Sequence, residues 1–164
     1  MVRWMLLRHA KSDWSQEDRS DHERPLNRRG QHAAPLLGEK MMSGRWLPDR
    51  ILCSTAVRAQ QTLQGLQRAW DSHTIDSIPV ETREDLYLAM ASTIQKITEE
   101  HHGNSQSLLI IGHNPGLELL ASLLAGEPIS MKTAHLVVFE AESWQAVHRP
   151  AAWQLIANFR GEGA

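Results

Sequence analysis

The sequence predicts an α/β fold, a layered sandwich built on a mainly parallel sheet. Strand-like and helix-like runs alternate along the chain, which is the pattern of a parallel sheet covered by helices. Residues 107–112, SLLIIG, form an unbroken apolar run, as expected for a strand that is covered on both faces. With 164 residues, 41% of them hydrophobic and 22% charged, the chain is predicted to form one domain over residues 1–164.

Six runs have the length and composition of short β-strands. They are residues 2–7, 51–54, 78–82, 107–112, 134–141 and 153–159. The run at 78–82 gives the weakest signal because it is short. The last two runs are separated by ESWQAVHRP, residues 142–150, which we expect to form a hairpin-like connection.

The first two helices are predicted before and after the second strand. The first spans residues 28–42, with Asn27 as its N-cap, because an asparagine side chain can accept a bond from a free N–H of the first turn. Pro35 lies inside this helix and is expected to kink or shorten it. One face of the second helix carries apolar side chains at helical spacing. These are Ala59, Leu63, Leu66 and Trp70.

Two further helices carry capping signals. The sequence STIQ, residues 92–95, has the form of a capping box and is predicted to open the third helix. Residues 114–126 are predicted to form the fourth. There Asn114 is expected to cap the helix, Pro115 to occupy its first position, and Gly126 to end it.

Composition excludes several classes of partner and location. The net charge is −2, so nothing indicates binding to nucleic acid or to a membrane surface, although net charge does not show where charges cluster.

Cys53 is the single cysteine, so no intrachain disulfide forms, and it is expected to be a buried small apolar residue. No apolar run approaches the length of about 18 residues that a membrane span needs. We therefore predict a cytoplasmic protein.

Polar side chains follow three of the predicted strands. Arg8 and His9 end the first strand, Arg58 lies in the first turn of the helix after the second, and His113 follows the strand at 107–112. In parallel sheets, sites form outside the carboxyl ends of the strands. These four side chains are therefore expected to meet at one edge of the sheet.

Two guanidinium groups and two helix N-termini at one edge would bind an anion. Guanidinium groups match tetrahedral oxyanions through paired hydrogen bonds, so phosphate is the expected ligand. A neutral imidazole beside it is a nucleophile near pH 7, and could take up the phosphoryl group as phosphohistidine. The second histidine, if protonated, would add a charged donor.

Three segments resemble the signature segments of the histidine phosphatase superfamily, which has the phosphoglycerate-mutase-like fold. They are LLRHAKSDW (6–14), STAVRAQQT (54–62) and GHNPG (112–116). The short chain and RPLNRRG (24–30) resemble its small phosphohistidine phosphatase branch. The resemblance implies a three-layer α/β/α sandwich with one antiparallel strand near the end, which suits residues 134–141.

The resemblance also implies residue roles. His9 would be the nucleophile, while Arg8, Arg58 and His113 would bind and polarise the phosphoryl group, with no metal and no cofactor. One departure is Ala10, where the common signature has glycine. Alanine is also small and is frequent in this branch.

Mutase-like members of the superfamily carry a glutamate that protonates the leaving group. In ETREDLYLA, residues 81–89, Glu84 is the favoured counterpart and Asp85 the alternative. An acid is not required for every substrate, because a P–N bond to imidazole breaks readily whereas an alkoxide needs a proton. Insertions that cover the substrate in mutases are absent at this length, which suits an open pocket.

Several other polar residues have competing interpretations. Ser12 is expected either to donate to a phosphate oxygen or to cap its own loop. Arg24 is expected either at the rim of the pocket or as a solvated loop charge. Thr62, one turn after Arg58, is expected to be a packing residue. His101 and His102 do not make a zinc site, because adjacent side chains on a helix diverge.

The leading hypothesis is a metal-independent phosphatase with a phosphohistidine intermediate. Its partner would be a phosphorylated protein, carrying phosphohistidine, or a small phosphorylated substrate. One alternative is a phosphoglycerate-mutase-like enzyme or a dedicated small-molecule phosphomonoesterase. Another is a non-catalytic phosphate-binding module on the same fold.

Overall fold

One six-stranded sheet organises the computed structural model, which describes residues 1–161. Its strands, in chain order, are β1 (Val2–Arg8), β2 (Arg50–Ser54), β3 (Val80–Arg83), β4 (Ser107–Gly112), β5 (His135–Ala141) and β6 (Gln154–Arg160). The order across the sheet is β3-β2-β4-β1-β5-β6. Strand β5 runs antiparallel to both of its neighbours, whereas β3, β2, β4 and β1 pair in parallel. The predicted mainly parallel sheet with one antiparallel strand is confirmed.

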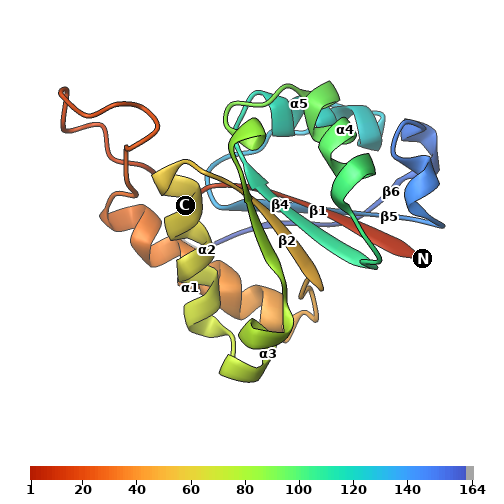
Figure 1. Ribbon diagram of the computed structural model, residues 1–164, viewed down its shortest axis with the longest axis horizontal. Coiled ribbons are helices and arrows are strands. Elements are labelled where there is room, and N and C mark those ends of the chain that lie inside the picture. The colour runs from red at the N-terminus through yellow and green to blue at the C-terminus, as the bar shows by residue number, and fades with distance from the viewer. Residues whose placement is uncertain (162–164) are drawn as a thin grey trace.

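Helices cover both faces of the sheet and complete three layers (Figure 1). Helices α1 (Arg28–Ser43) and α2 (Val57–Ala69) cover one face, together with the short α3 (Ser72–Ser77). Helices α4 (Ala91–His101) and α5 (Gly116–Ala125) cover the other. Short 3-10 turns at Glu84–Leu86, Trp144–Ala146 and Pro150–Ala152 lie in the connections. The last two lie between β5 and β6, which are antiparallel neighbours, so the hairpin-like connection that the sequence predicted is confirmed.

The alternation of side chains along the central strands divides the core into two halves. In β1, Trp4 and Leu6 belong to the core under α4 and α5, whereas Met5 and Leu7 belong to the core under α1 and α2. Successive side chains of a strand point to opposite faces, so a strand between two helical layers must be apolar at every position. The four residues 108–111 of β4 are fully buried, which explains their unbroken apolar run.

Helix α1 begins as predicted and continues past its proline. The Asn27 side chain accepts a hydrogen bond from the Gly30 N–H (2.9 Å). Pro35 lies inside the helix, which nevertheless extends to Ser43, so the expected shortening is wrong. At this point α1 packs closely on α2, where a Cβ added to Gly65 would lie 3.3 Å from the Pro35 ring. Packing between the helices stabilises α1 across the lost hydrogen bond.

The predicted starts of two helices are wrong. Helix α4 has Met90 as its N-cap, without a side-chain capping bond, so the proposed capping box does not form. Pro115 is the N-cap of α5 rather than its first residue, and the Asn114–Pro115 peptide is cis. The Asn114 side chain instead donates to the Met131 carbonyl (2.8 Å). Gly126 ends the helix in the left-handed conformation, as predicted.

Two other expectations can be compared with the structure. Cys53 is a free, buried thiol on β2, and burial raises its pKa to about 12, so it is the inert apolar residue that the sequence suggested. Along residues 1–161, no helix is both long and apolar enough to cross a membrane.

Candidate active site

The four polar side chains predicted to converge line one pocket at the carboxyl ends of β1, β2 and β4. The pocket has a volume of about 270 Å³ and contains Arg8, His9, Arg58 and His113 among its lining residues. The rings of His9 and His113 are 5.2 Å apart between centroids. The convergence that the sequence predicted from three separate strand ends is present.

The backbone around His9 is fixed on several sides. The His9 N–H donates to the Gly112 carbonyl at the end of β4 (3.2 Å), and the His9 carbonyl accepts from the Ala134 N–H (3.0 Å). The next residue, Ala10, donates its N–H to the Thr62 hydroxyl (2.9 Å). Thr62 in turn donates to the Arg58 carbonyl (2.7 Å). Thr62 therefore ties α2 to the loop after His9, a positioning role beyond simple packing.

The His9 ring has a defined tautomer. Its Nδ1 lies 2.7 Å from the Ala10 carbonyl oxygen, which only accepts, so Nδ1 carries the proton. Its Nε2 accepts a hydrogen bond from Arg58 Nε (3.2 Å), which requires a lone pair on Nε2. Burial lowers the pKa of His9 to about 3, against the opposing effect of the Ala10 carbonyl. His9 is therefore neutral near pH 7, with its unprotonated nitrogen, Nε2, facing Arg58.

His113 is also neutral near pH 7. Burial, and then the charge of Arg58, lower its pKa to about 3. Its Nε2 lies 2.7 Å from the Ser54 hydroxyl, and its buried Nδ1 has no hydrogen-bond partner within residues 1–161. The sequence suggested a charged donor here if the ring is protonated. An anion against Nδ1 would favour that protonated form, because a nearby opposite charge stabilises it.

The two arginines differ in their surroundings. Arg58 is 2% exposed, and its Nη1 donates to the Asp21 carbonyl (2.6 Å) while Nη2 pairs with the Asp21 carboxylate (3.0 Å). Arg8 donates from Nη1 to the Met131 carbonyl (3.0 Å). The buried Nε of Arg8 has no partner within the described chain. A buried guanidinium needs a counter-charge, and for Arg58 it is Asp21.

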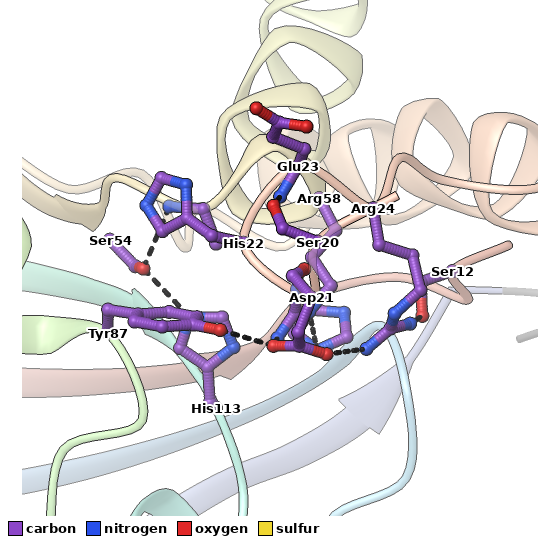
Figure 2. A network of polar contacts seen from close by, with 12 residues as sticks. Ser12, Ser20, Asp21, His22, Glu23, Arg24, Ser54, Arg58, Tyr87 and His113 are labelled. Carbon is purple, nitrogen blue, oxygen red and sulfur yellow. Dashed lines mark hydrogen bonds and ion pairs between the residues drawn. The ribbon is translucent and has the colours of Figure 1, made fainter. Parts of the chain in front are cut away.

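Asp21 joins three donors at the mouth of the pocket. Its carboxylate accepts from Arg58, from Arg24 (2.9 Å) and from the Tyr87 hydroxyl, and Figure 2 shows it between Tyr87 and Arg24. Burial alone would raise the pKa of Asp21, but the bonds from Tyr87 and Arg24 and the charge of Arg58 outweigh burial and hold that pKa well below its usual range. Asp21 is therefore ionised and occupies donors that a bound phosphate would use.

Asp21 and Tyr87 belong to the site but were not predicted from the sequence. Asp21 lies in a polar loop without periodicity, 37 residues before Arg58, so no local pattern links the two. The same loop also bonds to the start of α2, one of the two helix N-termini that were expected to bind the anion. The Val57 N–H donates to the His22 carbonyl (3.0 Å), and the His22 ring lies 2.8 Å from the Thr55 hydroxyl.

Ser12 and Arg24 lie at the rim of the same pocket. Arg24 donates to the Ser12 hydroxyl, and its guanidinium lies 3.6 Å from the centre of the Trp14 ring. Trp14 is 72% exposed. The rim thus combines a fixed cation with an exposed aromatic face, so Arg24 belongs to the pocket and is not a solvated loop charge.

Glu84 and Asp85 lie outside the pocket. Both are exposed residues of the 3-10 turn after β3, and they line a separate surface depression with Thr82 and Arg83. The Asp85 carboxylate pairs with Arg83 (2.7 Å). Of the residues the structure describes, Asp21 contributes the one carboxylate that lines the pocket with His9. The structure does not bring Glu84, the favoured acid, to the reacting group.

Comparison with known proteins settles the family. Residues 4–87, which include Arg8, His9 and Arg58, match the histidine phosphatase superfamily (branch 1). The chain belongs to this superfamily. A chloroplastic protein of Arabidopsis thaliana is 32% identical over 163 residues, covering 93% of this chain and 75% of the relative. A Mycobacterium tuberculosis protein is 37% identical over 119 residues, covering 73% and 70%.

Solved structures place the chain in the small SixA-like branch. SixA of Agrobacterium tumefaciens, a predicted phosphohistidine phosphatase, has a TM-score of 0.81 at 30% identity, covering 96% of this chain and 97% of its own. A protein histidine phosphatase SixA complexed with tungstate has the same fold, with a TM-score of 0.79 at 18% identity over 97% of each chain. The chain is therefore a phosphatase that acts through a histidine intermediate. Its cytoplasmic location stays a prediction.

The buried neutral histidines predict a loss of stability in acid. The pKa of His9 is about 3 in the folded chain and about 6.5 when unfolded, so the unfolded state takes up protons first as pH falls. The free energy of unfolding should be highest above about pH 6.5 and should fall below it by up to about 1.4 kcal/mol per pH unit for each such histidine.

Urea denaturation of wild type and His9→Asn between pH 6 and 4.5 tests this linkage. The slope of unfolding free energy against pH should be shallower in the variant by up to about 1.4 kcal/mol per pH unit. His9→Gln serves as the matched control, since it must give the same slope whatever its own stability. Equal slopes in wild type and both variants would show that His9 titrates normally.

Proposed function

We propose that the protein is a metal-independent phosphatase in which His9 is the nucleophile and protein phosphohistidine, or a small phosphoryl compound with a comparably good leaving group, is the substrate. One observation carries this proposal. The bond between Nδ1 and the Ala10 carbonyl leaves the lone pair on His9 Nε2, at the wall of the pocket, where it accepts a hydrogen bond from Arg58 Nε that a bound phosphoryl group would take over.

The reaction has two transfers. The lone pair of His9 Nε2 attacks phosphorus while the bond from phosphorus to the leaving group breaks, which leaves the phosphoryl group on Nε2. Water then attacks the phosphohistidine, releases inorganic phosphate and restores the neutral ring. As Nε2 bonds to phosphorus, positive charge grows on the ring and on Nδ1–H. The Ala10 carbonyl at 2.7 Å stabilises that charge.

Arg8, Arg58 and His113 would hold the phosphoryl oxygens. Charge spread over three equatorial oxygens is stabilised by fixed cationic donors. Asp21 pairs with Arg58 and Arg24 and orients both guanidinium groups before substrate arrives. Binding then exchanges one anion for another at the same guanidinium groups, so these buried cations need not be desolvated again.

The positions of Glu84 and Asp21 favour substrates whose leaving groups need no proton. Glu84 does not line the pocket, and Asp21 is held ionised by three donors, so within residues 1–161 no carboxylic acid is poised to protonate an alkoxide. An imidazole leaves with much less need of a proton than an alkoxide. The same arrangement disfavours the mutase-like and alkyl phosphomonoesterase alternatives. The names of the SixA-like neighbours point in the same direction.

Removing the nucleophile should abolish turnover. With phosphoramidate as substrate, His9→Asn should lower kcat at least about 10³-fold, since a covalent route is lost. EDTA should leave the wild-type rate unchanged. Rapid quenching of the wild type should trap one phosphoryl group per chain on His9, labile in acid. Phosphoenzyme formed on another residue, or turnover by His9→Asn, would refute the mechanism, and binding without any turnover would support the non-catalytic module.

The leaving group should control the rate, and Glu84 should not. We expect phosphoramidate and aryl phosphates to react at least about 10²-fold faster than alkyl phosphates, the range of effect that a missing general acid gives. Glu84→Gln should change kcat less than twofold on each substrate, with Glu81→Gln as a matched control on the same segment. A selective loss on alkyl phosphates in Glu84→Gln would identify it as the acid and revive the mutase-like alternative.

A further inference from the structure

Two exposed apolar side chains line the pocket of His9. They are Trp14, in the loop after β1, and Leu88, which follows the 3-10 turn after β3. Trp14 is 72% exposed and Leu88 is 53% exposed. Every other described residue that lines this pocket is polar or charged. We call the pair Trp14 and Leu88 the apolar rim. Exposed apolar side chains that gather at a pocket are typical of a site that a ligand covers.

The Trp14 ring is supported on one face. The Arg24 guanidinium lies 3.6 Å from the ring centre, and Arg24 is itself paired with the Asp21 carboxylate (2.9 Å). The backbone beside the ring is also fixed, since the Asp13 N–H donates to the Pro25 carbonyl (2.8 Å). A side chain that is already ordered loses little conformational entropy when a ligand packs against it.

Leu88 is held at the pocket by an unfavourable backbone conformation. Its φ is +51°, in the left-handed region that glycine adopts more readily than leucine. Just before it, the Tyr87 N–H donates to the Glu84 carbonyl (3.0 Å). Just after it, the Ala89 N–H donates to the Leu86 carbonyl (3.3 Å). Such conformations persist where the surroundings impose them, and they cluster at ligand sites.

The direction of phosphoryl transfer places the leaving group at the apolar rim. His9, Arg58 and His113 are at most 6% exposed, so a phosphoryl group must enter the depth of the pocket to meet them. The attacking and leaving atoms lie roughly in line on opposite sides of phosphorus. A leaving group opposite His9 Nε2 therefore points toward the mouth, where the exposed side chains of the apolar rim lie.

The chemistry of the apolar rim favours a flat ring as the leaving group. Aromatic rings pack against tryptophan in stacked or edge-to-face arrangements, and leucine adds apolar contact without a hydrogen bond. The pocket has a volume of about 270 Å³, near the lower end of the range from about 300 Å³ upward that small-molecule sites occupy. This volume suits a phosphoryl group with one small ring.

We propose that the apolar rim is the subsite for the leaving group and selects a planar ring bonded to phosphorus directly or through one oxygen. This inference rests on the proposed function. It narrows the substrate class from any phosphoryl compound with a good leaving group to those that release a small flat ring, of which the imidazole of phosphohistidine is one. Trp14 and Leu88 would contact that ring and determine specificity.

Two substrates with a P–N bond test the inference, because only one of them carries a ring. N-phosphoimidazole releases imidazole, whereas phosphoramidate releases ammonia. The specificity ratio is kcat/KM for N-phosphoimidazole divided by kcat/KM for phosphoramidate. Trp14→Ala should lower this ratio at least about 5-fold, the lower limit for a ring stacked on an aromatic side chain, and Trp14→Phe should keep most of it. The ratio cancels any general effect of the substitution on Arg24 or on folding.

Leu88→Gly tests the other half of the apolar rim. Glycine suits a φ of +51°, so this variant should unfold at about the wild-type urea concentration, and its specificity ratio should fall at least about twofold. Leu119→Ala is the matched control, since Leu119 is an exposed leucine of α5 that does not line the pocket. A ratio that Trp14→Ala leaves unchanged, or that Leu119→Ala lowers equally, would overturn the inference.

Binding of phosphonates separates this inference from the proposed function. Phenylphosphonate, cyclohexylphosphonate and methylphosphonate differ in the group on phosphorus, and their P–C bond resists hydrolysis. By isothermal titration, phenylphosphonate should bind the wild type at least about 5-fold more tightly than either of the others, and Trp14→Ala should remove the difference from methylphosphonate. That result would support the apolar rim even if the protein hydrolysed no phosphoryl compound. Equal affinity for phenylphosphonate and methylphosphonate, or for phenylphosphonate and cyclohexylphosphonate, would contradict it even if His9 proved to be the nucleophile.

Discussion

The hydrogen bond from His9 Nδ1 to the Ala10 carbonyl decides what the pocket can do. It leaves the lone pair on Nε2, beside Arg58, and burial keeps the ring neutral. Three surrounding elements hold the backbone at this bond in place. The end of β4, the loop before β5 and Thr62 of α2 each fix the backbone next to His9. If the ring could rotate or change tautomer, the Nε2 lone pair would no longer be oriented toward the phosphorus atom.

The second constraint is the burial of positive charge. Arg58 lies in the interior with Asp21 as its partner, and Asp21 also orders Arg24 and Tyr87 at the pocket mouth. The cationic pocket is thus folded around an internal anion that a phosphate can replace. This explains how two neutral histidines and several guanidinium groups coexist in one small volume.

The sequence predicted those features that depend on strand order and on local residue type. Arg8, His9, Arg58 and His113 could be placed together because parallel strands bring their carboxyl ends to one edge. Asp21 could not be found this way, since a polar loop has no periodicity to reveal where it folds. Glu84 was misplaced because spacing alone does not show which way a short 3-10 turn faces. The start of α5 was misjudged because the side chain of Asn114 forms a tertiary hydrogen bond with Met131 instead of capping the helix.

The state of the His9 ring can be observed directly by nitrogen-15 NMR of the imidazole between pH 4 and pH 8. The account predicts a proton on Nδ1, none on Nε2, and no protonation of the ring until the pH falls toward 3. A ring that carries its proton on Nε2, or that titrates near its ordinary value of about 6.5, would contradict it.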